Sequence, residues 1–447
     1  MFLYETQQGW GFPRSEADTM RKISIALMTM ALSPLLLAAQ ARNAARTQYT
    51  VINLGTLGGV LGSFAHSINK EGWISGIANL PGDTEEHAAL WRDGVITDLG
   101  TLGGDNSGAD SPVKNNAGLI VGSAQISTVD PLGENFCTAT CTPSGGACNG
   151  SNLSCRAFRW QSGVMDSLRT LGGNNSAATG ANNRGLIVGL AENSTQDPNC
   201  IPPQVLDYKP VVWQGGTIHE LPVIAGDVIG AALGANDKNQ LVGASGMCGS
   251  GPALGPVPVH ALLWQNEAVS DLGSLGGVVN NVAYAINNAG QIAGASDLPG
   301  DNTGHAFLWQ NGAMADLGTL PGDFLSVANA INDKGRVVGQ SCDVTFNCRA
   351  FVWQSGVMTD LNDLTSPSSL YLLVAYDINS EGEIVGIGLD QSTGVPLAFA
   401  AVPCGQNGDV QGCGDPVQTA VGVDKPKPVL PDSLREKLRK RLGFRRF

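Results

Sequence analysis

Short stretches of alternating apolar and polar residues, separated by glycine-rich turns, recur along most of the chain. In the first recurring pattern an Asn-x-x-Gly turn joins two strands, and the second strand is apolar and ends in Gly. Its seven copies begin at Asn69, Asn115, Asn182, Asn236, Asn287, Asn332 and Asn379. The fourth turn residue is Gly in six copies and Asn239 in the other. We therefore predict a left-handed backbone at this position, which Gly and Asn tolerate best.

A second pattern follows each of these turn units and is an apolar strand that ends in Trp. Six copies end at Trp91, Trp160, Trp213, Trp264, Trp309 and Trp353, and a seventh, Leu397–Ala401, has no Trp. A two-residue turn such as Asp93-Gly94 then leads into a fourth strand and the sequence Asp-Leu-Gly-Thr-Leu-Gly-Gly, complete at Asp98–Gly104. One unit is thus four short strands, and its length of about 45 residues is that of a four-stranded propeller blade.

The two ends of the array are incomplete in complementary ways. Tyr49–Gly59 reads as a fourth strand without the three strands before it, and the last unit ends at Val402 without a fourth strand. A ring uses this complementarity to leave no blade edge exposed, whereas an open solenoid gains nothing from it. We predict an all-β fold, a seven-bladed β-propeller of four-stranded antiparallel blades, closed by the N-terminal strand pairing with the last blade. An open solenoid and other β arrangements are the alternatives.

These patterns resemble the HAF-repeat family of predicted extracellular bacterial proteins, named for the tripeptide present here as His305-Ala306-Phe307. The resemblance covers Tyr49–Val402, and the combined pattern is specific although each tripeptide alone is weak. The resemblance implies secretion and a repetitive fold, and it implies no established activity. The segment Lys209–Gly226 departs most from the pattern, because ELPVIAG replaces the usual fourth-strand exit there.

The N-terminal region has the features of an export signal. A basic pair follows Met20, then comes the apolar stretch Ile23–Ala39, and the small-residue pattern Ala39-Gln40-Ala41 fits cleavage before Arg42. We expect a cleavable signal peptide, a secreted protein in the periplasm or outside the cell, and no transmembrane span in the mature chain. An uncleaved membrane anchor is the alternative. The sequence leaves open whether translation starts at Met1 or Met20.

Composition divides the chain into four segments. They are residues 1–41, upstream sequence and signal peptide; 42–403, a propeller of seven HAF-like repeats; 404–431, a cysteine loop and Pro-rich linker; and 432–447, a basic amphipathic tail. In the tail, Leu434, Leu438 and Leu442 are spaced by four and share one helical face. Three fates are open for it: docking on an anionic envelope surface, docking on the acidic propeller, or a solvated tail.

The charge balance excludes one class of partner. The formal charge of the chain is −13, and 15% of its residues are charged. Nucleic-acid recognition requires a basic face, so we expect no nucleic-acid partner.

The ten cysteines are expected to pair in an oxidising compartment. The predicted disulfides are Cys342–Cys348 across one hairpin loop, Cys404–Cys413 after the last strand, and Cys200–Cys248 between neighbouring blades. Four more cysteines lie in one insertion, where three pairing schemes are possible: Cys137, Cys141, Cys148 and Cys155. A zinc knuckle in that insertion is the alternative.

The residues that carry chemistry occupy equivalent positions of different units, so we do not expect them to converge on one site. His87, His260 and His305 share one repeat position, which favours a structural role over metal binding. Four acids recur at one position of the fourth strand. We expect them to accept hydrogen bonds from nearby backbone N–H groups: Asp98, Asp271, Asp316 and Asp360. The LPGD loops offer one carboxylate each, too few for calcium. No catalytic residue, metal ligand or cofactor site is predicted.

The Trp residues and the variable loops are the remaining candidates for recognition. We expect the Trp side chains to pack between blades, because Trp buries a large area and needs one hydrogen-bond acceptor. A stacking platform for sugars or nucleobases is the alternative. The loops between the second and third strands vary most in length, from ANLPGDTEE at 78–86 to the insertion at 123–155. Their end of the propeller is therefore the candidate recognition surface, with tolerated insertion as the alternative.

These observations favour a secreted binding or scaffold module for an unknown extracellular protein or glycan. The alternative is a propeller hydrolase or lyase acting on polysaccharide or cell-envelope material, which needs clustered carboxylates at the channel. The strand expected to line the channel, SxAxAIN, is small and neutral. Binding is therefore favoured over enzymatic activity, which stays open.

Overall fold

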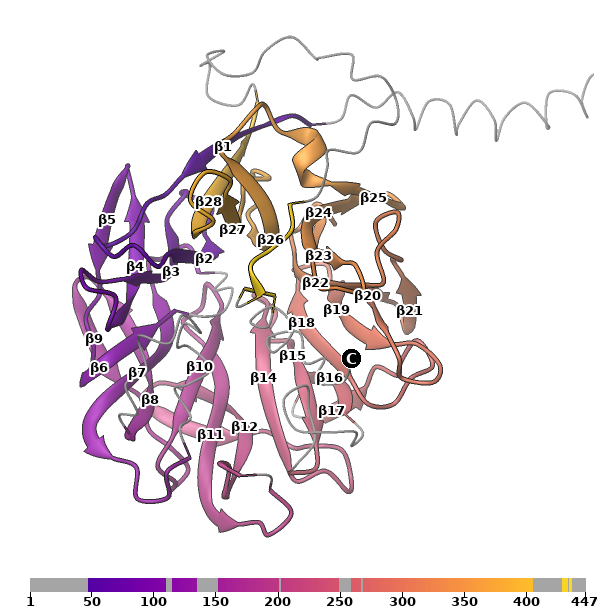
Figure 1. Cartoon of the computed structure of the whole chain (residues 1–447). Helices are drawn as coiled ribbons and strands as arrows, with labels where there is room; N and C mark the ends of the chain where they lie inside the picture. The colour runs from indigo at the N-terminus through magenta and orange to yellow at the C-terminus, as the bar shows by residue number, and fades with distance from the viewer. Residues whose placement is uncertain are drawn as a thin grey trace, which may run out of the picture. The chain divides into compact units, whose positions relative to one another are not determined.

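The structure is a computed structural model that describes residues 47–109, 115–134, 152–200, 202–248, 259–266, 268–404, 428–432, 434 and 435. These residues form seven four-stranded antiparallel sheets arranged as a ring of blades (Figure 1). The predicted seven-bladed propeller is thereby confirmed. The predicted signal peptide lies outside the described residues, within which no helix is long and apolar enough to cross a membrane.

Each blade uses four strands that follow one another in the chain, except the last. Blades 1 to 3 are β2 (Ser63–Ile68), β3 (Ile74–Asn79), β4 (Glu86–Arg92), β5 (Val95–Asp98); β6 (Gly103–Gly108), β7 (Ile120–Val129), β8 (Leu153–Gln161), β9 (Val164–Ser167); and β10 (Ser176–Ala181), β11 (Ile187–Gln196), β12 (Leu206–Gln214), β13 (Thr217–Glu220). Blades 4 to 6 are β14 (Ile229–Ala235), β15 (Leu241–Gly246), β16 (Val259–Gln265), β17 (Ala268–Asp271); β18 (Asn281–Ile286), β19 (Ile292–Asp297), β20 (Gly304–Gln310), β21 (Ala313–Asp316); and β22 (Leu325–Ile331), β23 (Val337–Cys342), β24 (Cys348–Gln354), β25 (Val357–Asp360). Blade 7 is β26 (Leu370–Ile378), β27 (Ile384–Asp390), β28 (Pro396–Pro403) and β1 (Tyr49–Asn53), and a 3₁₀ turn at Leu361–Leu364 precedes it.

The first strand, β1, closes the ring as the fourth strand of blade 7. It pairs antiparallel with β28 and places Tyr49 opposite Pro403. Just beyond this pair the backbone N–H of Cys404 donates to the carbonyl oxygen of Gln48 at 2.8 Å. The complementary ends read from the sequence therefore meet in one sheet.

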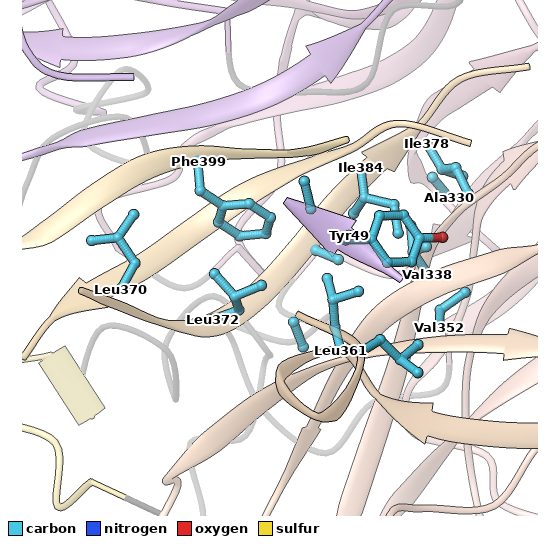
Figure 2. Close-up of a cluster of buried hydrophobic side chains, with 14 residues drawn as sticks. Tyr49, Ala330, Val338, Val352, Leu361, Leu370, Leu372, Ile378, Ile384 and Phe399 are labelled. Carbon is cyan, nitrogen blue, oxygen red and sulfur yellow. The ribbon is translucent and has the colours of Figure 1, made fainter. Parts of the chain in front are cut away.

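Tyr49 anchors this closing strand in the core between the last two blades. Figure 2 shows its ring among the side chains of Leu361, Ile384 and Val338, and only 1% of Tyr49 is exposed. Burial of an aromatic side chain contributes a few kcal/mol of hydrophobic free energy. The closure is thus held by side-chain packing as well as by backbone hydrogen bonds.

The Gly inside each second strand is required by the packing of the first strand across it. A Cβ atom placed at Gly189 would lie 2.1 Å from the carbonyl oxygen of Ala177. The corresponding distances are between 1.9 and 2.1 Å at Gly76, Gly122, Gly189, Gly243, Gly294, Gly339 and Gly386. No side chain fits there, which explains why the Gly recurs in all seven copies.

The first strands contain a β-bulge that the repeat pattern did not reveal. In blade 1 the pairing register shifts between Ala65 and Ser67, so His66 occupies the bulge. The same position is taken by Thr179, Leu233, Tyr284, Asn329 and Tyr376 in later blades. The strand expected to be small and neutral therefore carries larger and polar side chains at this point, and that expectation was wrong.

The bulge residues connect neighbouring blades. The Asn329 side-chain amide donates to the carbonyl oxygen of Ala375 in the next blade at 2.9 Å. His66 of blade 1 packs against Tyr376 of blade 7 with ring centres 4.6 Å apart. An extra residue in a strand re-aims its side chain, and here it is used to join blades.

The Trp side chains lie between blades, as their packing role requires. Trp91, Trp213 and Trp264 are between 2% and 4% exposed. Their indole N–H groups donate to backbone carbonyl oxygens just after the fourth strand of the preceding blade, at Leu54 (2.9 Å) and Arg169 (2.8 Å) for the first two. An indole ring that is buried, with its N–H already bonded to a backbone carbonyl oxygen, offers no stacking face to a ligand.

Two of the predicted disulfides are confirmed. Cys200 is bonded to Cys248, which joins blades 3 and 4, and Cys342 is bonded to Cys348 across one hairpin loop. Cys137, Cys141, Cys148 and Cys413 lie outside the described residues, so the pairings expected for them stay predictions.

Candidate functional site at the turn face of the channel

The order of the strands gives the propeller two different faces. The Asn-x-x-Gly turns and the hairpins between third and fourth strands lie at one end, which we name the turn face. The loops between second and third strands and the connections between blades lie at the other end, the loop face. The sequence pointed to the loop face for recognition, but a cavity lined by residues of all seven blades lies at the turn face.

The Asn-x-x-Gly turns have the backbone conformation that the sequence predicts. The fourth turn residue has a positive φ in every copy, including +57° at Asn239, +77° at Gly72 and +90° at Gly382. Inside the turn, the side-chain oxygen of Asn287 accepts hydrogen bonds from the N–H groups of Ala289 (3.0 Å) and Gln291 (2.9 Å). The Asn side chain thus fixes its own turn, a local bonding habit of this residue.

The same Asn side chains also join each blade to the next. The Nδ2 of Asn287 donates to the carbonyl oxygen of Asn332 at 3.0 Å. Equivalent bonds lead to the next blade from Asn115, Asn182, Asn236, Asn332 and Asn379. The last of them reaches Asn69 and crosses the point where the ring closes. Six bonds of this kind therefore form a belt of amides around the channel at the turn face.

The residue after each Asn forms a second, outer belt. Its backbone N–H donates to the side chain of its counterpart in the next blade, as from Asn183 to Asp237 (2.9 Å) and from Asn288 to Asp333 (2.8 Å). The Asn288 Nδ2 lies 3.3 Å from one carboxylate oxygen of Asp237 and 3.1 Å from one of Asp333. One amide therefore holds the two carboxylates on either side of it.

These two belts form the rim of the cavity, and isoleucines form its base. The outer belt consists of Lys70, Asn116, Asn183, Asp237, Asn288, Asp333 and Ser380, and the base includes Ile68, Ile286, Ile331 and Ile378. The cavity has a volume of about 80 Å³. Because two carboxylates face one ammonium group, the rim carries a net charge of about −1. A polar rim over an apolar base is the usual make-up of a small-ligand pocket.

The histidines are paired with carboxylates and do not converge. His87 Nδ1 lies 2.8 Å from Asp98 Oδ1, and His305 Nδ1 lies 3.0 Å from Asp316 Oδ1 in another blade. Asp98 also accepts the N–H of Gly100 at 2.7 Å, the backbone contact expected of these acids. Burial opposes ionisation of Asp98, yet the bonds from His87 and Gly100 hold its pKa below its usual value.

The other two members of this set are paired differently. His260 meets Asp227, from the connection into its blade, at 2.9 Å. Arg349, which stands at the histidine position, lies 3.2 Å from Asp360 and 3.0 Å from Asp323. Each pair lies in its own blade, so these residues brace the repeats and form no shared site.

The LPGD carboxylates have two different structural roles. Asp83 accepts the N–H groups of Val60 (2.8 Å) and Leu61 (2.9 Å), and Asp301 does the same at the equivalent connection of blade 5. The third LPGD lies in the connection into blade 6, where Asp323 binds Arg349. The same tetrapeptide thus occurs in loops between second and third strands and in a connection between blades. The sequence alone did not distinguish these two locations.

Three buried carboxylates lie together at the loop face between blades 2 and 3. Asp130, Glu134 and Glu192 are at most 2% exposed. The Asn175 side-chain amide donates to Asp130 (2.9 Å) and Glu192 (3.0 Å), and Gln204 Nε2 lies 3.2 Å from Glu134 and 3.0 Å from Glu192. Burial, and then the charge of Glu134, raise the pKa of Glu192 to about 7. Asp130, Glu192 and the Oε1 atom of Glu134 accept hydrogen bonds from amides, which suits a structural network better than a metal.

Among the described residues, one group of possible metal ligands lies close together at the loop face. Side-chain atoms of Asp197, Cys200, Asp207 and Cys248 lie within 4.8 Å of one another. The two cysteines form a disulfide and so supply no thiolate. The remaining two carboxylates are too few for a calcium site.

Sequence reasoning found the Asn turns but missed what they do together. The signal was present, because the Asn is kept in all seven copies while the next residue varies among Lys, Asn, Asp and Ser. A turn needs no such strictness, since Asp and Ser also make local turn bonds. Asn recurs because its side-chain amide also donates a hydrogen bond to the next blade, which Asp and Ser side chains cannot do in the same way.

Comparisons with known proteins give no close relative. No family model matches the chain, and no curated protein matches its sequence. Among solved structures it is similar to the Pyrococcus horikoshii acylaminoacyl peptidase, with 9% identity and a TM-score of 0.42 over 73% of this chain and 49% of that one. It is also similar to the β-propeller domain of the Trilobed protease from Pyrococcus furiosus (8% identity, TM-score 0.43, 76% of this chain and 93% of that one).

A third similar structure is the six-bladed fungal lectin from Aleuria aurantia, which recognises fucose (7% identity, TM-score 0.34, 79% of this chain and 100% of that one). The chain spans about half the length of the acylaminoacyl peptidase. With TM-scores below 0.5, none of these similarities carries an argument about function.

Proposed function

We propose that this protein is an exported binding module whose turn-face cavity holds a small sugar, either free or at the end of a glycan. The observation that carries the proposal is the cavity itself, with its rim of amide, carboxylate, hydroxyl and ammonium groups over a base of isoleucines. A sugar ring presents hydroxyl groups at its edge and C–H groups on its face, which match that rim and base. The cavity volume of about 80 Å³ suits a small ligand such as a single sugar and is too small to hold the surface of a partner protein.

Export and membership of the HAF-repeat family are part of the same proposal. The basic pair, apolar stretch and small-residue pattern before Arg42 support export. The disulfides Cys200–Cys248 and Cys342–Cys348 suit an oxidising compartment. The repeat patterns between Tyr49 and Val402 support the family.

A blocking substitution tests the cavity while it leaves the inner belt and the other six residues of the outer belt in place. Ser380 lines the cavity, and its hydroxyl donates to the exposed Glu381 carboxylate at 3.2 Å. We expect Ser380→Trp to fill the cavity and weaken sugar binding by at least about tenfold. Ser392→Trp, on an exposed loop of the loop face, is the matched control and should bind as the unchanged chain does.

The measurement is a glycan array with the mature chain, followed by calorimetry with each sugar that binds. Equal melting temperatures of the two variants would show that neither disturbs the fold. An array without any bound sugar, or equal binding by both variants, would contradict the proposal.

A further inference from the structure

The segment near the C-terminus packs on the propeller at the loop face. Leu430 and Leu434 are only 2% and 4% exposed. In Figure 1 this segment, coloured yellow, lies in the middle of the ring beside β26 and β18. Leu430 belongs to the segment 404–431 that the sequence assigns to a cysteine loop and Pro-rich linker, and the structure buries it against the propeller. Of the three alternatives that the sequence left open for the tail, docking on the propeller is the one that Leu434 follows.

The two leucines join an apolar surface built by three blades. They belong to one hydrophobic cluster with Tyr284 of blade 5, Phe324 at the entry to blade 6, and Tyr371, Leu373 and Tyr376 of blade 7. We name these five residues the loop-face mouth. Tyr284 and Tyr376 are bulge residues of first strands, so the mouth extends from the loop face into the channel.

A polar contact fixes the segment at one point. The backbone N–H of Leu430 donates to the side-chain oxygen of Asn347 at 3.1 Å. Asn347 lies in the hairpin loop that the Cys342–Cys348 disulfide closes, so its position is constrained covalently. The loop thus offers a preorganised acceptor beside the apolar surface.

We propose that the loop-face mouth is a binding site for a Leu-x-x-x-Leu segment, and that the C-terminal segment of the same molecule occupies it. Leu430 precedes a short helical turn that begins at Asp432, and Leu434 lies within that turn; both leucines are buried in the same cluster. Val429, next to the first anchor, is 79% exposed, so the contact selects the two leucines and not apolar residues in general. The five mouth residues are different from the residues that line the cavity, so this site does not depend on the sugar proposal.

Tethering and charge both favour occupancy within one molecule. The 23 residues from 405 to 427 connect the last strand to the segment, and such a link gives a high effective concentration. Basic residues follow the anchors, including Lys437, Arg439 and Lys440, while the whole chain has a formal charge of −13. The acidic body attracts the basic tail at a distance, and the leucines provide the short-range contact.

Occupancy of the mouth has a direct consequence for recognition. A partner that uses the loop face near the channel must compete with the tethered segment. The apparent affinity of such a partner is reduced by the fraction of molecules in which the segment is docked. Access to this end of the channel is therefore controlled by the chain itself.

The test uses full chains and one labelled peptide. The peptide comprises residues 428–447 with a fluorophore, and the acceptor is the full chain carrying Leu430→Asp and Leu434→Asp, whose own segment is released. We expect the peptide to bind this acceptor at least about tenfold more tightly than it binds the unchanged chain. A chain with Val429→Asp is the matched control and should behave as the unchanged chain. Binding is followed by fluorescence anisotropy.

Three outcomes would overturn the proposal. Equal peptide binding by the double variant, the unchanged chain and the Val429→Asp chain would show that Leu430 and Leu434 do not occupy the mouth. Absence of binding to the double variant, with its melting temperature unchanged, would show that the mouth is no peptide site. A concentration-dependent dimer of the unchanged chain, lost in the double variant, would place the segment on a second copy instead.

Discussion

Glu192 shows how a single buried group can make the stability of the propeller depend on pH. Its carboxyl is inaccessible to solvent and shares a network with Glu134 and Asp130. Burial, followed by the charge of Glu134, raises its pKa from 4.5 to about 7. For an acid, a raised pKa in the folded protein means that the protonated form fits the fold better than the ionised form.

We predict that Glu192→Gln reduces the loss of stability between pH 5 and pH 8. The contribution of Glu192 is complete below the unfolded pKa of 4.5 and disappears as the pH rises through about 7, because the folded chain must then bury a charge. The free energy of unfolding of the unchanged chain should fall by about 3 kcal/mol more than that of the variant. Urea unfolding at both pH values measures this, with the exposed Glu71→Gln as the control. Equal falls in all three chains would contradict the assignment.

At the residue scale, sequence reasoning succeeded where one position has one local requirement. The left-handed backbone at Asn239 follows from steric exclusion alone and was predictable. The partners of Asp83 and Arg349 were not, because they lie in loops whose distance in space depends on the whole blade. The LPGD tetrapeptide shows why sequence reasoning fails here, because the same four residues occur in a hairpin loop at Asp83 and in a connection between blades at Asp323.

At the scale of the element, the second strand of each blade sets how closely the first strand can pack. The Gly at its third position leaves room for a backbone carbonyl of the first strand. Strand boundaries were predictable because turn residues flank each run. The bulge in the first strand was not, because the bulge residue varies among His, Thr, Leu, Tyr and Asn and so leaves no recurring letter.

Two Gly-to-Ala substitutions in blade 3 test this packing requirement. We predict that Gly189→Ala destabilises the chain by at least about 2 kcal/mol, because the new Cβ would lie 2.1 Å from the Ala177 carbonyl oxygen. Gly180→Ala is the matched control, since its nearest neighbour, the Leu233 carbonyl oxygen, lies 3.2 Å away. The cost there should stay below about 1 kcal/mol. Similar urea midpoints for both variants would show that the blade adjusts without cost.

At the scale of the whole molecule, the ring depends on contacts between residues far apart in the chain. The amide belt crosses the closure from Asn379 to Asn69, and Tyr49 fills the core beside Ile384 and Phe399 (Figure 2). Closure was predictable because the incomplete ends of the array match. The occupied loop-face mouth was not, since a leucine pair in a basic tail has no unique docking place from sequence alone.

Residue-resolved hydrogen exchange of the closing strands tests the ring most directly. In the closed ring β28 lies between β27 and β1, and the N–H groups of Cys404 and Leu54 donate to Gln48 (2.8 Å) and Ala398 (3.0 Å). We predict that these two amides, and those of β28 that face β1, exchange as slowly as the amides of β27. Exchange of these amides within seconds, while β27 stays protected, would mean that β1 is not the fourth strand of the last blade and that the ring is open.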